Sequence, residues 1–440
     1  MKVLKFGGTS VGSAARMKEV AKLITDGERK IVVLSAMSGT TNTLVEISDY
    51  LYKKNPEGAN EIINKLESKY RQHIEELFVT PEYKQKGHEL IKSHFDYIRS
   101  YTKDLFTLFE EKVVLAQGEL ISTAMMNYYL QECGTQSVLL PALEYMRTDK
   151  NAEPDPVYIK EKLHIQLELH PDADIYITQG YICRNAYGEI DNLQRGGSDY
   201  TASLIGAAVN AAEIQIWTDI DGMHNNDPRI VDKTTPVRHL HFEEAAELAY
   251  FGAKILHPTC IQPAKYANIP VRLLNTMAPT APGTLISNDT EKGKIKAVAA
   301  KDNITAIKIK SSRMLLAHGF LRKVFEIFES YQTSIDMICT SEVGVSVSID
   351  NVKHLNEILD DLKKYGTVTV DEGMCIICVV GDLEWENVGF EAKALDAMRE
   401  IPVRMISFGG SNYNISFLIR EEDKRAALQS LSNALFGEVQ

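Results

Sequence analysis

The sequence predicts an α/β sandwich with a mostly parallel sheet, followed by two small α+β modules. Three observations support this prediction. Short apolar segments alternate with helical patterns up to about residue 295, as in α/β proteins. After a loop that contains Pro279, Pro282 and Gly283, the apolar runs become short and alternating. A unit of about 70 residues then occurs twice.

Composition limits the possible functions. The 440 residues are 44% apolar and 25% charged, with a net charge of −12, which predicts two to three domains with a large core. No basic run stands out, so we expect no nucleic-acid or membrane-surface partner. No apolar run has the length of a membrane span, and the N-terminus lacks the pattern of a signal peptide. With six scattered cysteines, we expect a cytoplasmic enzyme.

The first element is a short apolar strand at residues 3–6 that contains Lys5. A lysine in such a strand needs a partner for its charge. Two glycines, Gly7 and Gly8, follow, and then a helical pattern that ends at Gly27. A strand, a glycine turn and a helix N-terminus together form a cradle for an anion. The alternative is a basic residue at a strand edge beside a tight turn.

The alternation continues through the N-terminal part of the chain. Residues 42–112 are charged and helical, and we expect surface helices there. In parallel sheets, ligands bind beyond the carboxyl ends of the strands, where this sequence places polar clusters. A helix is expected at 120–131, and further strands at 31–35, 113–116, 137–140, 175–178 and 214–218.

The C-terminal part contains the repeat. One copy opens a helix at Gly319 and the other at Gly389, and each copy has a βαββαβ pattern. We expect the first module at about 311–370 and the second at about 371–440, with a strand from about 300–310. The repeat could be purely structural, but its place after an enzyme-like domain favours a sensor.

Two cysteines in the second module have CxxC spacing. Cys375 and Cys378 lie in a continuous apolar run, without a second pair or a histidine cluster. This context favours a buried strand over a metal or redox site.

Three further clusters carry polar chemistry. In the first cluster, residues 194–201, glycines precede an expected helix. The guanidinium group of Arg195 could bind a carboxylate, and the carboxylate of Asp199 could hold a lysine in place. An ion pair between Arg195 and Asp199 is the alternative. The second, residues 217–229, is polar and rich in turns, and could equally be a surface hairpin. In the third, residues 250–258, Lys254 lies at the end of an apolar helix, where a lone lysine is usually solvated.

Together these segments resemble the motifs of aspartokinases, in the same order. The C-terminal modules resemble the tandem ACT domains of that family, and residues 314–321 and 334–342 resemble its lysine-inhibited, single-function type. The resemblance implies an amino-acid-kinase catalytic domain at 1–295 and a regulatory region at 296–440. The matching motifs are residues 5–11, 118–123, 195–199, 217–219, 227–229 and 251–258.

The resemblance implies ATP-dependent phosphorylation of the side-chain carboxylate of L-aspartate. That carboxylate is already ionised near neutral pH, so the reaction needs positioning and positive charge rather than a general base. Lys5 would span the transferring phosphoryl group and Asp199 would hold Lys5. Mg²⁺ would bridge the phosphates, mostly through water and phosphate oxygens, and no protein metal site is expected.

The implied binding residues fall into two groups. In the first group, Arg195 would take the α-carboxylate of aspartate and Glu119 its ammonium group. The residues implied for aspartate are Thr41, Glu119, Tyr181, Arg195, Gly196, Gly197 and Ser198. Those implied for ATP are Gly7, Gly8, Ser35, Thr218, Asp219, His224, Arg229, Lys254 and Ile255. The family more often has tyrosine at His224, glycine at Gln194 and phenylalanine at Tyr181.

The resemblance also implies an allosteric amino acid. Asp336 suits an effector with an extra positive charge, which favours lysine over threonine; the alternative is that Asp336 caps a helix. Ala317 replaces a frequent serine, so inhibition is expected to need more lysine. ACT modules usually pair, so we expect at least a homodimer. The implied effector residues are Met314, Ala317, Phe320, Leu321, Ser334, Ile335, Asp336, Ser341 and Glu342.

Two other functions remain open. One is another amino-acid kinase of the same fold, such as glutamate 5-kinase or acetylglutamate kinase, which do not combine the cluster at 195–199 with tandem ACT modules. The other is a non-catalytic amino-acid sensor, which would be expected to lose Lys5 or Asp199.

Overall fold

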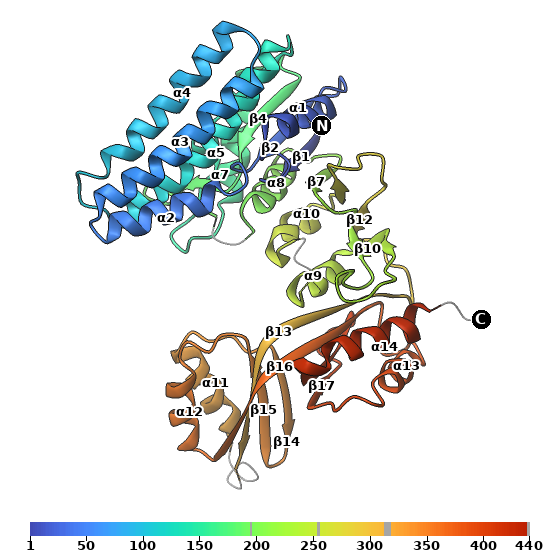
Figure 1. The fold of residues 1–440 in the computed structure, drawn as a ribbon. Helices are drawn as coiled ribbons and strands as arrows, with labels where there is room; N and C mark the ends of the chain where they lie inside the picture. Colours follow the sequence, from blue (N-terminus) through green and yellow to red (C-terminus); the bar gives the residue numbers. More distant parts are fainter. Residues whose placement is uncertain (194–195, 253–255, 312–317, 438–440) are drawn as a thin grey trace. The chain divides into compact units, whose positions relative to one another are not determined.

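The computed structural model describes residues 1–193, 196–252, 256–311 and 318–437. The chain forms two compact units, which are described separately (Figure 1). The first contains Met1–Met223 and Ile255–Asn288, and the second contains His224–Lys254 and Asp289–Gln440. Residues 224–254 therefore group with the C-terminal region and not with the rest of the predicted 1–295 domain. The backbone explains this grouping, since the Val298 N–H donates to the Asn225 carbonyl at 2.8 Å.

The sheet of the first unit is mostly parallel, as predicted. Its central strand β1 pairs in parallel with β2 and β7, and only β12 runs antiparallel to its neighbour β11. All five residues of β2 are buried, which fits a strand covered on both faces. In spatial order the strands are β3 (Ser137–Leu140), β4 (Ile175–Gln179), β2 (Lys30–Leu34), β1 (Lys2–Phe6), β7 (Ile214–Thr218), β11 (Val271–Asn275) and β12 (Thr284–Ser287).

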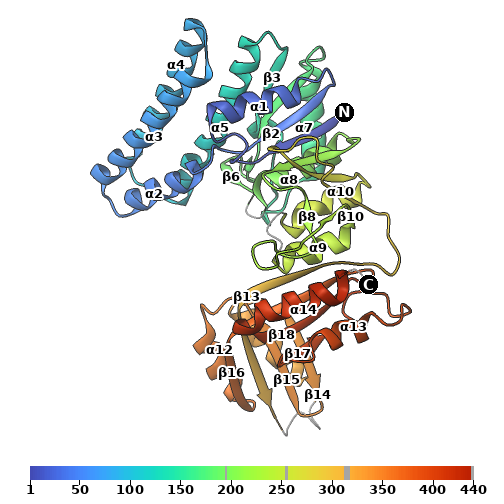
Figure 2. The ribbon, with the colours of Figure 1, turned by 45° about the vertical axis from the view of Figure 1, so that its right-hand side comes forward.

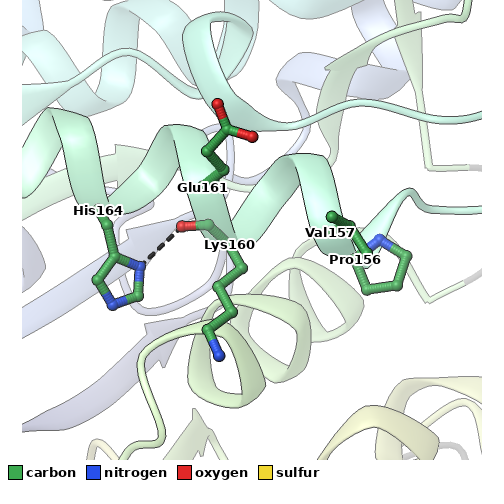
Figure 3. A pocket seen from close by; sticks show the side chains of 5 residues that line it. All are labelled: Pro156, Val157, Lys160, Glu161 and His164. Atoms are coloured by element: carbon green, nitrogen blue, oxygen red, sulfur yellow. Dashed lines mark hydrogen bonds between the residues drawn. The ribbon is translucent and has the colours of Figure 1, made fainter.

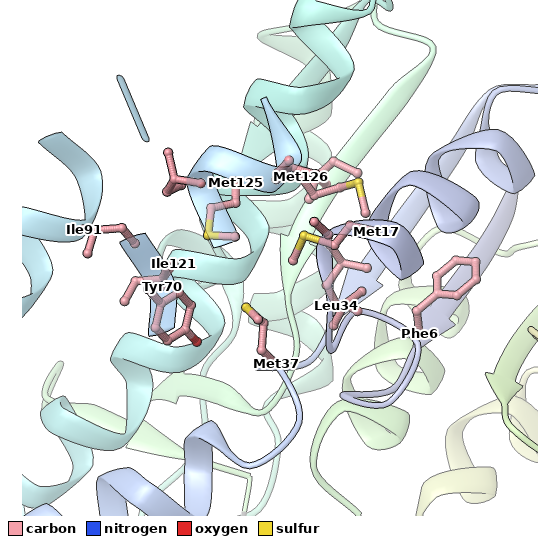
Figure 4. Close-up of a cluster of buried hydrophobic side chains, with 14 of the residues drawn as sticks. Phe6, Met17, Leu34, Met37, Tyr70, Ile91, Ile121, Met125 and Met126 are labelled. Atoms are coloured by element: carbon pink, nitrogen blue, oxygen red, sulfur yellow. The ribbon is translucent and has the colours of Figure 1, made fainter. Parts of the chain in front are cut away.

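Helices cover both faces of this sheet. Leu4 and Phe6 of β1 pack into a large apolar cluster with the helices α1 to α5 (Figure 4). Side chains alternate along a strand, so Lys5 faces the opposite layer, where α8 contacts β1. The helices of this unit are α1 (Ala14–Ile24), α2 (Thr40–Tyr52), α3 (Pro56–Leu77), α4 (Pro81–Ser100), α5 (Leu108–Glu132), α6 (Ala142–Tyr145), α7 (Pro156–Glu168), α8 (Gly197–Ala208) and α10 (Gln262–Tyr266), with a 3-10 turn at Pro258–Ile261.

The charged region at 42–112 is helical, as predicted, but its helices also build the core. Tyr70 of α3 and Phe95 of α4 are fully buried, with ring centroids 5.8 Å apart. Asn55 and Thr80 cap the first turns of α3 and α4, each followed by a proline at the first helical position.

The predicted strand at 113–116 is wrong, because these residues lie inside α5. The helix begins earlier, at Leu108, where Thr107 and Glu110 form a capping box. Residues 114–119 are all buried, so this part of the helix is covered on every side and shows no amphipathic period. A short apolar run of that kind cannot be told from a buried strand by pattern alone.

The second unit contains an antiparallel six-stranded sheet with a helix pair on each module (Figure 2). Helices α11 and α12 pack on the first module, and α13 and α14 on the second. In spatial order the strands are β14 (Met337–Ser341), β15 (Gly344–Ile349), β13 (Ile295–Lys310), β16 (Thr367–Gly381), β18 (Asn414–Arg420) and β17 (Met405–Ser407). The helices are α9 (Phe242–Tyr250), α11 (Phe320–Ser330), α12 (Leu355–Lys363), α13 (Phe390–Ala397) and α14 (Lys424–Phe436), with a 3-10 turn at Glu421–Asp423.

The repeat is confirmed in this sheet. Gly319 and Gly389 precede α11 and α13 in equivalent positions, with φ of 84° and 94°, a conformation that favours glycine. Cys375 and Cys378 are fully buried in β16, as expected for a structural strand. The short remaining strands are β5 (Ile182–Arg184), β6 (Ile190–Asn192), β8 (Met223–His224), β9 (Pro236–Val237) and β10 (His239–His241).

The strand assignment for the second module needs a correction. Residues 305–310 of β13 pair with β15 of the first module, whereas residues 297–301 pair with the 376–380 part of β16 in the second. The predicted strand at 300–310 is therefore mostly a first-module strand, and the second module uses its N-terminal continuation. A register shift at 301–304, with Asn303 at φ 59°, lets one long strand serve both modules.

The close contact between α8 and β7 gives a stability prediction. A Cβ at Gly206 would lie 2.4 Å from Ile214 Cδ1. We expect Gly206→Ala to lower the free energy of unfolding by about 1–2 kcal/mol, because overpacking exceeds the gain in helix propensity. Gly410→Ala is the control, since nothing lies within 4 Å of its Cβ. Thermal denaturation of both variants checks this, and equal melting temperatures would contradict it.

Candidate functional site

A lysine–aspartate pair lies at the centre of the first unit. The Lys5 ammonium is 2.8 Å from Asp199 Oδ1, and the two side chains are 11% and 16% exposed. Asp199 Oδ1 has no aligned hydrogen bond within the described part of the chain, so the contact is an ion pair. A lysine held in this way by a carboxylate can still face an anion with its exposed part.

The two glycines after β1 allow a close approach of three segments. A Cβ at Gly7 would lie 3.4 Å from Lys5 Nζ, and one at Gly8 would lie 2.8 Å from the Ala36 carbonyl oxygen. The Ser38 N–H donates to the Gly8 carbonyl at 3.1 Å. The glycine loop therefore lies directly on the loop that follows β2, and its backbone is open to a ligand.

A cleft of about 390 Å³ opens beside this loop. It collects residues from the ends of β1 and β2, from α5 and from the start of α8. The Ser35 hydroxyl donates to Ser198 Oγ at 2.9 Å across it. Its lining residues are Gly8, Ser35, Ala36, Met37, Ser38, Gly39, Thr41, Asn42, Glu119, Tyr181, Gly197 and Ser198. The predicted site residues did not include Ala36, Met37, Ser38, Gly39 or Asn42, although the segment after the 31–35 strand was expected to lie where ligands bind.

Glu119 supplies the negative charge of the cleft. Its Oε1 accepts the Ala36 N–H at 3.3 Å, and its Oε2 is buried without a hydrogen-bond partner among the described residues. Burial raises the pKa of this carboxyl to about 7, because a low-dielectric environment disfavours the charged form. A ligand cation at Oε2 would satisfy both the open acceptor and the charge.

Strained backbone shapes the opposite wall. Tyr181 has φ 69°, and its N–H donates to Thr201 Oγ1 at 2.9 Å. Gly196 precedes α8 with φ 74°, and a Cβ there would lie 1.8 Å from Cys260 Sγ. Positive φ in residues beside a cleft is typical of ligand-binding loops. Burial raises the pKa of the Tyr181 hydroxyl to about 12.

Two of the predicted nucleotide residues lie at the next strand end. Thr218 ends β7, whose residue Trp217 is in register with Phe6 of β1, and the exposed Asp219 follows. The Thr218 carbonyl accepts both the N–H and the hydroxyl of Thr276, each at 2.8 Å. Thr276 Oγ1 in turn lies 3.3 Å from Ser10 Oγ. Thr276, which sequence reasoning missed, thus connects the glycine loop with the end of β7.

Two other residues predicted for the nucleotide, His224 and Arg229, have partners of their own within the second unit. His224 Nδ1 is 2.9 Å from Thr234 Oγ1, and Arg229 pairs with Asp227 at 2.7 Å. His224 and Arg229 belong to the second unit, so their place at the nucleotide stays a prediction. Arg195, Lys254 and Ile255 lie outside the described residues, as do Met314 and Ala317 of the predicted effector set.

The described members of the predicted effector set lie at the start of α11, directly before β14 and at the end of β14. Asp336 directly precedes this strand, so the alternative that it caps a helix is wrong. Its side chain is buried and contacts Lys301 at 2.9 Å. Ser341 donates to the Gly344 carbonyl at 3.4 Å. The remaining members are Phe320, which is buried at the start of α11, and Leu321, Ser334, Ile335 and Glu342, which are partly or largely exposed.

A second depression lies along α7 and has a different character (Figure 3). Its lining comes from one helix, with Pro156, Val157, Lys160, Glu161 and His164. The one polar contact drawn among them is His164 Nδ1 with the Lys160 carbonyl at 2.7 Å. Polar groups do not converge there as they do beside Lys5. The cleft at Glu119 is therefore the better candidate site.

Metal-binding clusters and membrane-spanning helices are both absent from the described residues. No group of three or more His, Cys, Asp or Glu side chains there could hold a metal ion. Among the helices described, none is both long and apolar enough to cross a membrane.

Comparison with known proteins agrees with this geometry. The amino acid kinase family model matches residues 1–275, and an ACT domain model matches residues 377–435. The chain is 35% identical over 461 residues to Aspartokinase 1, chloroplastic, of Arabidopsis thaliana, covering 99% of this chain and 80% of that protein. The chain belongs to the aspartokinase family.

Solved structures show the same likeness. E. coli aspartokinase III in complex with aspartate and ADP, in the R-state, has a TM-score of 0.85 at 32% identity, covering 99% of this chain and 100% of the other. The same enzyme in complex with lysine and aspartate, in the T-state, has a TM-score of 0.81 at 32% identity, covering 99% of both chains.

The contact at Gly196 gives a prediction for the site. We expect Gly196→Ala to lower kcat/KM for aspartate about tenfold to a hundredfold, because the clash with Cys260 and the positive φ displace the start of α8. Gly196→Ala/Cys260→Ala should recover part of this loss, since Sγ is gone, and Cys260→Ala alone is the control. Steady-state kinetics measure this. An unchanged kcat/KM in Gly196→Ala would show that the loop tolerates a side chain.

Proposed function

We propose that this aspartokinase transfers the γ-phosphoryl group of ATP to the side-chain carboxylate of L-aspartate in the cleft beside Lys5. The observation that carries the proposal is the Lys5–Asp199 ion pair, 2.8 Å long, at the mouth of a glycine loop. A carboxylate oxygen attacks the γ-phosphorus, the bond to ADP breaks, and 4-phospho-L-aspartate is formed.

Charge repulsion is the main obstacle to this reaction, since an anionic nucleophile approaches anionic phosphates. Lys5 places a cation between the two reactants, and Asp199 orients that cation. The N–H groups of Gly7 and Gly8 are assigned as further donors to the phosphates. Such preorganised groups lower the barrier without a general base.

Substrate recognition is assigned to the other groups of the cleft. We infer that Glu119 binds the ammonium group of aspartate, because its Oε2 is buried and has no partner among the described residues. On the basis of the family motif, Arg195 is assigned to bind the α-carboxylate of aspartate. Thr41, Tyr181, Gly196, Gly197 and Ser198 form the walls around the substrate.

The nucleotide is assigned to the strand ends around the glycine loop. Gly7, Gly8, Ser35, Thr218 and Asp219 are its first-unit contacts. His224, Arg229, Lys254 and Ile255 are assigned from the family pattern. Mg²⁺ is assigned to the phosphates of ATP, where it would be held mostly by water and phosphate oxygens. When bound, this ion neutralises the phosphate oxygens.

The alternatives are less well supported. A non-catalytic sensor has no need for an ion pair between Lys5 and Asp199 beside an open cleft. A glutamate or acetylglutamate kinase agrees less well with the full-length similarity to aspartokinases.

Regulation by lysine is the second part of the proposal. The likeness to an enzyme solved with lysine supports it, together with the buried carboxylate of Asp336. We also propose a homodimer that forms through the first ACT module. The apolar side chains of Leu321, Phe325 and Ile338 in this module are 36–41% exposed, and a dimer contact could cover them. The cytoplasm stays the compartment predicted from the sequence.

Lys5 gives the decisive catalytic prediction. We expect Lys5→Met to lower kcat for aspartate about a hundredfold or more, because one charge-stabilising group is removed, and Asp199→Asn to act in the same direction. Lys2→Met is the matched control, since Lys2 lies in the same strand and pairs with Glu28 at the surface. Hydroxylamine trapping of the acyl phosphate is measured with aspartate, glutamate and acetylglutamate. Product from glutamate or acetylglutamate alone would contradict the proposal.

Glu119 gives a pH prediction. Its pKa is raised to about 7, so the carboxylate that binds an ammonium group is lost as the pH falls through 7. We expect KM for aspartate at saturating MgATP to rise from pH 8 to pH 6, approaching tenfold per pH unit below the pKa. Glu119→Gln should raise KM and remove most of this dependence. A wild-type KM that is constant over this range would refute the assignment.

A further inference from the structure

The carboxylate of Asp336 forms a polar cluster with the side chains of Tyr250, Lys301 and Asp350 within the second unit. The Tyr250 hydroxyl donates to Asp336 Oδ1 at 2.6 Å, and Lys301 Nζ lies 2.9 Å from the same oxygen. Lys301 also pairs with Asp350 at 2.9 Å and lies 4.3 Å from the centroid of the Tyr250 ring. One residue from α9, one from β13 and one before β14 thus meet at a single carboxylate oxygen.

The same end of α9 is also fixed through its backbone. A Cβ at Gly252, which has φ 118°, would lie 2.1 Å from the Ala300 carbonyl oxygen. Ala300 and Lys301 are consecutive residues of β13. The glycine of the family motif at 251–258 is therefore needed to place the chain on the regulatory sheet, directly beside the Asp336 cluster.

The charges of the cluster leave room for one more cation. Two carboxylates, Asp336 and Asp350, face one ammonium group, that of Lys301. Asp336 Oδ2 is buried without a hydrogen-bond partner within the described ranges. Burial and Asp336 raise the pKa of the Tyr250 hydroxyl to about 12, so Tyr250 remains a hydrogen-bond donor at neutral pH.

We propose that the Lys301 ammonium group pairs with the carboxylate of Asp336 when no effector is bound there. Tyr250 is then the positioning residue that transmits effector binding at Asp336 to the segment after α9. An effector ammonium at Asp336 competes with Lys301 and with the Tyr250 hydroxyl for one carboxylate. Effector binding at Asp336 therefore weakens the contact between the first ACT module and α9. The chain then continues into Lys254 and Ile255, which we assigned to the nucleotide. This inference rests on the proposed regulation by lysine.

Linkage gives the expected direction. The Tyr250–Asp336 hydrogen bond stabilises the effector-free state, so its removal favours the effector-bound state. We expect Tyr250→Phe to lower both the Kd for L-lysine and the lysine concentration for half inhibition, about threefold to tenfold. Phenylalanine keeps the ring over Lys301 and the edge contact with Phe251.

The matched control is Tyr331→Phe. Tyr331 also donates to an aspartate of the first ACT module, Asp361, at 2.8 Å, but that pair does not contact Asp336. We expect the response of Tyr331→Phe to lysine to equal that of the wild type. Lys301→Met provides a second variant, which removes the internal ammonium group and should also tighten lysine binding.

The measurements are isothermal titration of the full chain with L-lysine or L-threonine, and inhibition curves with both. If lysine neither binds nor inhibits the wild type, the proposed regulation and this inference both fail. If lysine inhibits the wild type but the Kd of Tyr250→Phe lies within twofold of the Tyr331→Phe value, this inference alone is overturned. Weaker lysine binding in folded Tyr250→Phe or Lys301→Met also overturns it, since competition requires the opposite sign.

Discussion

The first unit depends on one constraint, which is that a lysine ammonium group must be held at the centre of an apolar parallel sheet. Lys5 lies in β1, between β2 and β7, where an unpaired charge would be strongly unfavourable. Only a carboxylate from the covering layer can neutralise it, and α8 begins where Asp199 can do so. The turn at Gly196, whose φ of 74° suits glycine, leads directly into this helix.

A different constraint governs the second unit. Its two modules share the long strands β13 and β16, so neither module has a complete sheet alone. Helix α9 lies on this sheet through Gly252 and Tyr250. The carboxylate of Asp336 is therefore one contact away from the helix that leads into the family motif at 251–258. Short-range coupling of this kind needs no long chain of intermediates.

Much of the fold and of the site followed from local sequence. Alternation, glycine turns and the 70-residue repeat correctly predicted the parallel sheet and the two C-terminal modules. The prediction failed where local pattern was ambiguous. Residues 113–116 have no amphipathic period because both sides of α5 are buried, and the 300–310 assignment failed because β13 bends and serves two modules. Thr276 and Tyr250 were missed because each acts through residues more than fifty positions away.

The sequence by itself determined which groups this protein has available: a lysine before two glycines, a glutamate in a helix, an aspartate at a helix start and a carboxylate in the first ACT module. Residue type and spacing suffice for that, because they fix charge, backbone freedom and local conformation. Only the tertiary structure decided which of these groups meet. Burial of Glu119, the pairing of Lys5 with Asp199 and the junction of Tyr250, Lys301 and Asp336 are set by packing between distant segments, and desolvation and Coulomb interaction depend on that packing.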